Sequence, residues 1–370
     1  MKICVITLTC SRLAGGLFYS VSELSRAVQG SGDFELEVWC VRDKEVDNDI
    51  AQWNGLNLKI YKNSAKIFGA RASLAMMVDA AKKDFDLVHI HGSWNFCSIV
   101  GRIFMARGVP IVVSPRGMYD PWILGRSKTL KKIFFKTIER KLYSNSAFVH
   151  ALNDKEAKSV GAVVDCRVTV VPNGVHAVDE RKFFGAPGKN RKLIYIGRLH
   201  EKKGLVEFLQ AWSNVSPAIR SGWIVEIYGW GDSDYVEKIN DAIVNGNLGG
   251  QVGVKGEVYG EVKRSVLAEA SAFFLPTKSE GLPMAILEAW SFGLPTLMTD
   301  DANLSIGFDR LAATRLSNVA DWSVDISNFL SSFDGLSQIM SDNAIQLVSE
   351  KYLWASVGKE MADKYLECIS

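Results

Sequence analysis

The 370-residue chain has 48% apolar and 23% charged residues and a net charge of +2, which is typical of a soluble globular protein and unlike a disordered one. It has no run of about 18 uninterrupted apolar residues, and its six cysteines form no C-x-x-C pair. A membrane-spanning helix, a disulfide framework and a zinc site are therefore not expected. The length predicts two domains, and the cysteine usage suits the cytoplasm.

Short apolar runs alternate with helical patterns along the first half of the chain. Strands are expected at 2–9, 34–40, 57–61, 86–90, 110–114, 147–151 and 168–171. Helices of ten or more residues are expected between several of them, for example at 17–29, 70–83 and 127–144. This alternation predicts right-handed β–α–β units and a parallel sheet.

The two predicted domains are separated by a turn signal, Pro172-Asn173-Gly174, and a polar stretch after it. We expect an N-terminal domain at 1–175, a linker at 176–191 and a C-terminal domain at 192–350. In the second domain, strands are expected at 192–197, 223–228, 251–255, 272–275, 295–299 and 311–315, with helices at 203–214, 233–245, 259–269 and 283–292. The predicted fold class is α/β, with two doubly wound Rossmann-like domains facing a central cleft that binds the ligand.

The charge is distributed unevenly between the two halves. Residues 1–175 carry a net charge of +8 and residues 176–370 a net charge of −6, which indicates an anionic partner for the first half, such as a phosphorylated acceptor or a membrane surface. Arg126 to Lys141 holds seven Lys and Arg residues and one acid around an apolar cluster. This segment predicts a basic helix that can lie on anionic lipid, with an ordinary solvated helix as the equal alternative. No nucleic-acid partner is predicted.

Glu280 and Glu288 give the strongest chemical signal. Glu280 is the first residue and Glu288 the last residue of the run EGLPMAILE. This run follows a predicted strand and opens a helix near Pro283. The helix start offers free N–H groups and a partial positive charge that suit a diphosphate. Carboxylates only accept hydrogen bonds, so they suit sugar and ribose hydroxyls. The alternative is a pair of ordinary surface glutamates.

Two cations follow the first strand of the second domain. In IYIGRLHEKKG, the strand ends at Gly197, and Arg198 and Lys203 come before the next helix. Arginine offers a planar fork of donors and lysine a point charge, which together suit a diphosphate. Lys202 is expected to be a solvated neighbour.

Three strand ends in the first half carry candidate ligand-binding residues. Gly15 and Gly16 let a loop approach a ligand closely, although a plain turn is equally possible. They do not form G-x-G-x-x-G, so a dehydrogenase is disfavoured. His91 is expected at the cleft and His89 packed within the strand. Arg116, in SPRGM, is a candidate for binding an anionic acceptor.

Two Asp-x-Asp pairs, Asp84/Asp86 and Asp232/Asp234, resemble the motif of metal-dependent transferases. The first precedes a strand and the second lies at a helix start, so structural roles are expected for both. No Cys, His and Asp cluster supplies further ligands. The sequence therefore predicts neither a metal nor another cofactor.

In chain order, these motifs resemble family 4 of the glycosyltransferases, the retaining enzymes with the two-domain GT-B fold. The resemblance covers most of the chain and is carried by Gly15-Gly16, His91-Gly92-Ser93-Trp94, Ser114-Pro115-Arg116-Gly117-Met118, Pro172-Asn173-Gly174, Gly197-Arg198 through Lys203-Gly204, and Glu280-x7-Glu288. The Glu-x7-Glu set is the most specific. The variant seen here resembles bacterial polysaccharide-assembly transferases.

The resemblance implies a nucleoside-diphosphate sugar as donor, held mainly by the second domain. Arg198 and Lys203 would neutralise the leaving diphosphate, where charge grows in the transition state. Glu288 would hold the ribose, and Glu280 the hydroxyls of the donor sugar. The acceptor would attack the face from which the leaving group departs, without a metal.

Further roles are implied by the same resemblance. Backbone amides near Gly281 and Leu282 would help to bind the phosphate, and His91 would line the sugar site. The helix at 351–370 would cross back to the N-terminal domain. Many members carry a Gly-rich loop after the position of Thr299, which is absent here, so no residue is assigned there.

The predicted function is transfer of a hexose-type sugar from a GDP- or UDP-sugar to a hydroxyl of a lipid-linked or oligosaccharide acceptor. It would serve cell-surface polysaccharide synthesis, such as exopolysaccharide or O-antigen, and could place the protein peripherally on the inner face of the membrane. A sugar-nucleotide epimerase of the same architecture and a non-catalytic glycan-binding protein are the alternatives. Arg198, Lys203 and the Glu-x7-Glu set favour transfer.

Overall fold

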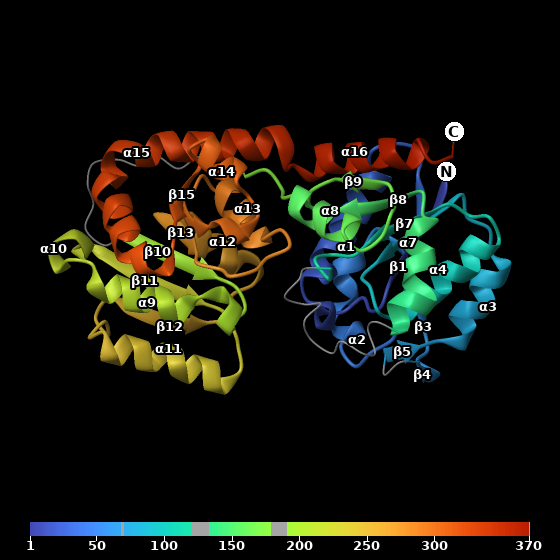
Figure 1. The fold of residues 1–370 in the computed structure, drawn as a ribbon, viewed down its shortest axis with the longest axis horizontal. Coiled ribbons are helices and arrows are strands. Elements are labelled where there is room, and N and C mark those ends of the chain that lie inside the picture. The colour runs from blue at the N-terminus through green and yellow to red at the C-terminus, as the bar shows by residue number, and fades with distance from the viewer. Residues whose placement is uncertain (68–69, 120–132, 179–190, 370) are drawn as a thin grey trace. The chain divides into compact units, whose positions relative to one another are not determined.

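The protein forms two compact units in the computed structural model, which describes residues 1–67, 70–119, 133–178 and 191–369. Unit 1 comprises Met1–Gly174 together with Trp354–Ser370, and unit 2 comprises Val175–Leu353 (Figure 1). Most of the predicted linker and the first part of the predicted basic helix, 126–132, lie outside the described residues. No helix among the described residues is long and apolar enough to span a bilayer.

Unit 1 is built on seven parallel strands in the order β3-β2-β1-β6-β7-β8-β9. Their bounds are β1 Lys2–Thr7, β2 Glu35–Val41, β3 Asn57–Tyr61, β6 Leu87–His91, β7 Ile111–Ser114, β8 Phe148–Ala151 and β9 Val168–Val170. The central strands are apolar on both faces because helices cover both sides of a parallel sheet. β1 pairs with β6 so that Thr7 lies opposite His91, which places both at the carboxyl edge of the sheet.

The helices of unit 1 begin where capping side chains satisfy free backbone N–H groups. Asn95 accepts from Cys97 N (2.8 Å), and Asn153 accepts from Glu156 N (2.8 Å). The helical segments are η1 Arg12–Ala14, α1 Gly16–Gln29, α2 Val46–Asp49, η2 Ile50–Trp53, α3 Leu74–Lys82, α4 Phe96–Ala106, the π-helix η3 Phe135–Glu139, α7 Arg140–Ser144, α8 Asp154–Gly161 and α16 Trp354–Leu366. The predicted basic helix is thus described only from residue 133 onward, where it is partly π-helical.

The helix predicted at 70–83 is wrong at its start. Residues Ala70–Ala72 form β5, which pairs antiparallel with β4, Ala65–Ile67, and α3 begins only at Leu74. The alanine-rich sequence has good helix propensity, but pairing with a neighbouring strand overrides propensity over so short a stretch.

The C-terminal helix α16 packs directly on α1 within unit 1. A Cβ added to Gly358 would lie 2.5 Å from the carbonyl carbon of Ala27, so the two helices touch at backbone distance. A Cβ on Gly174 would likewise lie 2.7 Å from the Trp354 ring. These contacts make the last helix part of the core of unit 1.

We expect Gly358→Ala to destabilise unit 1 by about 1–3 kcal/mol, because the added methyl overpacks the helix contact and outweighs a helix-propensity gain of about 1 kcal/mol. Thermal or urea unfolding measures the change. Gly161→Ala is the matched control, since its added Cβ would meet nothing within 4 Å. Equal stabilisation by the two substitutions would contradict the close α1–α16 contact.

Unit 2 contains a six-stranded parallel sheet in the order β12-β11-β10-β13-β14-β15. The strands are β10 Arg191–Ile196, β11 Trp223–Tyr228, β12 Val252–Gly256, β13 Ala272–Leu275, β14 Thr296–Thr299 and β15 Ala313–Leu316. The helical segments are η4 Glu201–Lys203, α9 Leu205–Asn214, α10 Pro217–Arg220, α11 Ser233–Asn245, α12 Gly260–Glu269, α13 Met284–Ser291, η5 Asp300–Ala302, α14 Ile306–Asp309, η6 Val319–Asp321 and α15 Trp322–Lys351. The predicted fold class, two α/β units with parallel Rossmann-like sheets, is confirmed.

Candidate functional site

In unit 2, a partly buried ion pair joins Lys203 to Glu280 at the carboxyl edge of the sheet. Lys203 ends η4, after β10, and Glu280 lies in the loop after β13. The Lys203 ammonium contacts Glu280 Oε1, with side chains only 14% and 11% exposed. Gly204 (φ +66°) brings the two loops together, since a Cβ there would lie 2.1 Å from the Pro276 carbonyl oxygen.

The pair keeps hydrogen-bonding capacity for a ligand. An ammonium has three donors, so Lys203 can hold Glu280 and still donate to an anion. Thr277 Oγ1 lies 3.3 Å from Glu280 Oε1, whereas Glu280 Oε2 makes no hydrogen bond within the described part of the chain. The arrangement therefore presents a cation and an acceptor oxygen side by side.

The loop after β14 holds the Glu280-Gly281 turn in place. Glu280 N donates to Asp301 O (3.1 Å). Asn303 donates its side-chain amide to Glu280 O and to Gly281 O (3.3 Å) from a left-handed backbone conformation, φ +59°. No residue of this loop was predicted from the sequence to belong to the site. An asparagine, which tolerates a left-handed conformation, is the one signal that could have pointed to it.

Arg198 lies at the surface of unit 2, with its side chain 50% exposed. Its guanidinium carbon is 5.0 Å from the centre of the Trp230 ring, and Nη2 is 3.7 Å from Asp232 Oδ2. Gly229 lets the Trp230 loop pass under Gly197, because a Cβ there would lie 1.8 Å from the Gly197 carbonyl oxygen. Within the described residues, no hydrogen bond or ion pair joins Arg198 to Lys203 or Glu280.

Glu288 lies on α13, one face of which is buried, and its Oε2 is 2.5 Å from Lys263 Nζ on α12. The Glu288 side chain is 32% exposed. The structure does not join Glu288 to Glu280 by any hydrogen bond in the part it describes. Leu282 is buried just before α13. The helix was predicted to start at Pro283, but Pro283 stands at the N-cap and α13 begins one residue later, at Met284. Lys263 was not predicted, because no sequence pattern around it distinguishes it from other surface lysines.

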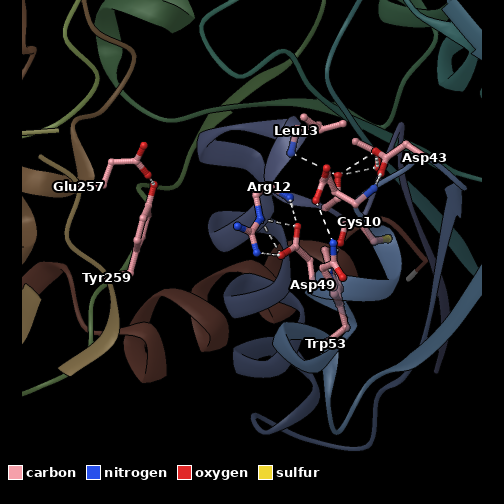
Figure 2. Close-up of polar contacts among 12 residues, drawn as sticks. Cys10, Arg12, Leu13, Asp43, Asp49, Trp53, Glu257 and Tyr259 are labelled. Atoms are coloured by element: carbon pink, nitrogen blue, oxygen red, sulfur yellow. Dashed lines mark hydrogen bonds and ion pairs between the residues drawn. The ribbon is translucent and has the colours of Figure 1, made fainter. Parts of the chain in front are cut away.

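In unit 1, two aspartates hold the loop between β1 and α1 (Figure 2). Asp43 accepts from Thr9 Oγ1 and from Ser11 Oγ (2.8 Å). Arg12 forms a two-pronged pair with Asp49, through Nη2 at 2.5 Å and Nε at 2.9 Å. Hydrogen bonding to Arg12 lowers the pKa of the Asp49 carboxyl, so the pair stays ionised at neutral pH. These contacts fix the loop between β1 and α1.

Gly15 and Gly16 follow this fixed loop. Gly15 is the N-cap of α1 with φ +61° and ψ −131°, a conformation that favours glycine, and a Cβ on either residue would meet nothing within 4 Å. Trp53 Nε1 donates to Cys10 O (2.9 Å) beneath the loop, as Figure 2 shows. The structure therefore places an unobstructed helix N-terminus at the position that the sequence predicted.

Three side chains, His91, Arg116 and Asn173, form a hydrogen-bonded row at the carboxyl edge of the unit 1 sheet, which we call the rim row. Arg116 donates to His91 Nδ1 from Nη2 (3.0 Å) and from Nε (3.3 Å), and to Asn173 Oδ1 from Nη1 (2.8 Å). Arg116 has a left-handed backbone conformation, φ +56°. Glu156 accepts a hydrogen bond from the next backbone amide, Gly117 N (2.5 Å). Such a conformation costs free energy and is concentrated at functional sites.

The rim row fixes the protonation of its histidine. Arginine only donates, so His91 Nδ1 must be an acceptor and the ring proton lies on Nε2. Burial, with the neighbouring His89 and Arg116, lowers the pKa of His91 well below its usual value, so the ring is neutral. Burial lowers the pKa of Arg116 to about 10, which leaves it charged at neutral pH. Among the described residues, the Arg116 guanidinium donates only to the neutral His91 and Asn173 side chains, and its role toward an anion stays a prediction.

The described residues contain no group of three or more His, Cys, Asp or Glu side chains that could hold a metal ion. Asp86 instead accepts from Lys2 N (2.7 Å), and Asp84 pairs with Arg107 (2.6 Å). These contacts account for the first Asp-x-Asp pair structurally.

Two family models match consecutive parts of the chain. The model of "Glycosyltransferase Family 4" matches residues 14–178, and that of "Glycosyl transferases group 1" matches residues 178–305. Together they include Gly15, Arg116, Lys203 and the Glu280–Glu288 run.

Curated relatives are similar over part of the chain. A GDP-mannose:cellobiosyl-diphosphopolyprenol alpha-mannosyltransferase of Xanthomonas oryzae is 29% identical over 62% of this chain and 60% of its own length. A UDP-Gal:alpha-D-GlcNAc-diphosphoundecaprenol alpha-1,3-galactosyltransferase of Escherichia coli is 27% identical over 65% of this chain and 64% of its own length. The chain thus matches less than two thirds of the length of these relatives.

Solved structures share the fold along nearly the whole chain. Anabaena HepE in complex with UDP and glucose superposes with a TM-score of 0.77, at 15% identity, over 99% of this chain and 100% of that one. Sucrose-phosphate synthase from Thermosynechococcus elongatus superposes with a TM-score of 0.75, at 15% identity, over 99% and 98%. The two matching family models and the shared fold show that the chain belongs to family 4 of the glycosyltransferases, with the GT-B fold.

Proposed function

We propose that the protein transfers a hexose from a GDP- or UDP-sugar to a hydroxyl of a saccharide carried on a polyprenyl diphosphate, in cell-surface polysaccharide assembly. The observation that carries the proposal is the partly buried Lys203–Glu280 pair at the carboxyl edge of the unit 2 sheet, where Glu280 Oε2 makes no hydrogen bond to any described residue. A ligand that needs both a cation and a carboxylate acceptor has an anionic part and hydroxyls, as a sugar diphosphate does. The names of the similar transferases support the same class of donor and acceptor.

In the proposed reaction, the bond from the anomeric carbon to the donor phosphate breaks and a bond to the acceptor oxygen forms on the same face. The acceptor proton goes to the departing phosphate. Lys203 would stabilise the negative charge that grows on the leaving group, and Arg198 would assist from its exposed position. Glu280 would accept hydrogen bonds from the sugar hydroxyls and Glu288 from the ribose.

In unit 1, the proposed roles follow from the protonation states. His91 would donate from Nε2 to a sugar hydroxyl, and Arg116 would attract the acceptor diphosphate. The open N-terminus of α1 at Gly15 and Gly16 would allow a ligand to approach backbone amides. No metal or other cofactor is part of the proposal.

The test is to incubate the protein with GDP-mannose, UDP-glucose or UDP-galactose and a short-chain polyprenyl-diphosphate saccharide. We expect nucleoside diphosphate to appear only when the acceptor is present, with a product one hexose heavier and the anomeric configuration of the donor. Glu280→Gln provides the inactive control. Consumption of the sugar nucleotide without acceptor, with release of an epimerised sugar, would replace the proposal by an epimerase. Binding without turnover for all three donors would contradict transfer of these hexoses.

A further inference from the structure

A second row of hydrogen bonds, the buried row, lies within unit 1 and links α16 to the sheet. Tyr365 OH is 2.5 Å from His89 Nδ1, and His89 Nε2 is 2.6 Å from Ser114 Oγ. Ser114 Oγ is 2.6 Å from His150 Nδ1, and His150 Nε2 is 2.7 Å from Val171 O. The side chains of Tyr365, His89, Ser114 and His150 are each at most 1% exposed. The row therefore runs from α16 through β6, β7 and β8 to the segment after β9.

The carbonyl at its end fixes the direction of every proton in the buried row. Val171 O can only accept, so His150 donates from Nε2 and accepts at Nδ1. Burial lowers the pKa of His150 to about 3, so the ring carries one proton only at neutral pH. Ser114 must then donate to His150 and accept from His89 Nε2, which leaves His89 Nδ1 as an acceptor. Tyr365 is the group that donates to it.

The buried row lies directly behind the rim row. His89 and His91 lie two residues apart on β6, so their side chains share a face of the sheet. Arg116 and Asn173 follow Ser114 and Val171 by two residues, beyond the ends of β7 and β9. The rings of His89 and His91 have their centres 4.0 Å apart. The orientation of the His89 ring therefore affects the orientation of the His91 ring, whose Nδ1 accepts from Arg116.

We propose that Tyr365 is a positioning residue for the rim row, so that the C-terminal helix completes the site of unit 1. This inference rests on the proposed function for its effect on turnover. Without the Tyr365 hydroxyl, His89 Nδ1 is left as a buried acceptor with no donor, a state that proteins avoid. The His89 ring then turns or exchanges its tautomer, and the His91 ring and Arg116 lose their fixed orientation.

The test compares Tyr365→Phe with Tyr61→Phe, using ¹⁵N-histidine NMR and steady-state kinetics on the full chain. Tyr61 is the matched control because it is buried in the same unit and its hydroxyl donates to Asp79 Oδ2 (2.7 Å) on α3, outside both rows. In the wild type we expect neutral Nε2–H rings for His89, His91 and His150. Tyr365→Phe is expected to shift the ring nitrogen signals of both His89 and His91 and to lower kcat on the order of tenfold, with the donor KM unchanged.

Several results would overturn the inference. One is a His91 signal that does not move in Tyr365→Phe, even if the variant is less stable. Another is a loss of turnover no larger than that of Tyr61→Phe. A wild-type protein that transfers no sugar would refute the proposed function alone, since the NMR comparison would still decide whether Tyr365 orders His91.

Discussion

Replacing Lys203 by methionine is expected to lower kcat by about 10²- to 10³-fold, because a preorganised cation next to the leaving group is worth about 3–4 kcal/mol in the transition state. Methionine keeps most of the side-chain length and removes the charge. The partly buried Glu280 carboxylate would then lose its ion-pair partner as well. Initial rates of nucleoside diphosphate release, at saturating donor and acceptor, measure the effect.

Lys278→Met is the matched control for this prediction. Lys278 lies in the same loop as Glu280 and also pairs with a glutamate, Glu207 (2.5 Å), but its side chain is 48% exposed. Exposed ion pairs contribute about 0–1 kcal/mol to stability, and Lys278 has no role in the proposed reaction. If Lys203→Met retained turnover equal to that of Lys278→Met, the assignment of Lys203 to the leaving group would be wrong.

Acidification is expected to destabilise unit 1 through its buried histidines. Burial lowers the pKa of His150 to about 3, and it lowers the pKa values of His89 and His91 well below the usual 6.5. As the pH falls below about 6.5, the unfolded chain takes up these protons and the folded chain does not. Each histidine then reduces the free energy of unfolding by about 1.4 kcal/mol per pH unit, so His150 alone accounts for about 2 kcal/mol at pH 5.

Two buried carboxyls, Glu139 and Glu156, offset part of this loss, because burial raises their pKa and the folded state takes up their protons first. Urea unfolding between pH 7 and pH 5 measures the net slope. His150→Gln should reduce the pH dependence of the free energy of unfolding by the uptake of one proton. A free energy of unfolding that stays constant over this range would show that the histidines do not remain neutral in the folded unit.

Helices and strands were predicted best where the packing of the folded chain favours the same element as the local sequence pattern. The strand ends at His91, Ile196 and Leu275 follow from short apolar runs followed by turn residues, and they place the candidate residues at one edge of each sheet. The long helix α15 was not predicted. Serines at many positions and Gly335 dilute its apolar pattern, so its stability comes from packing on the sheet and not from propensity.

The contacts that order the candidate sites could not be predicted, because they join residues far apart in the chain. Tyr365 meets His89 across 276 positions, and Lys263 meets Glu288 across 25, with no periodic pattern to indicate either. Arg116 was predicted as a residue for an anionic acceptor. Its hydrogen bonds to His91 and Asn173 add a role in the rim row that residue type alone does not indicate.

The most direct test of the central claim, that the Lys203–Glu280 site binds the donor, is hydrogen–deuterium exchange with a panel of nucleoside diphosphates and their sugars. At 100 times its dissociation constant, the right nucleotide should stabilise the fold by about 2.7 kcal/mol. We predict slower exchange around Lys203 and from Glu280 to Glu288 with GDP or UDP, and loss of this protection in Lys203→Met. Protection elsewhere in the chain but not at these segments, or none with any nucleotide, would contradict the claim.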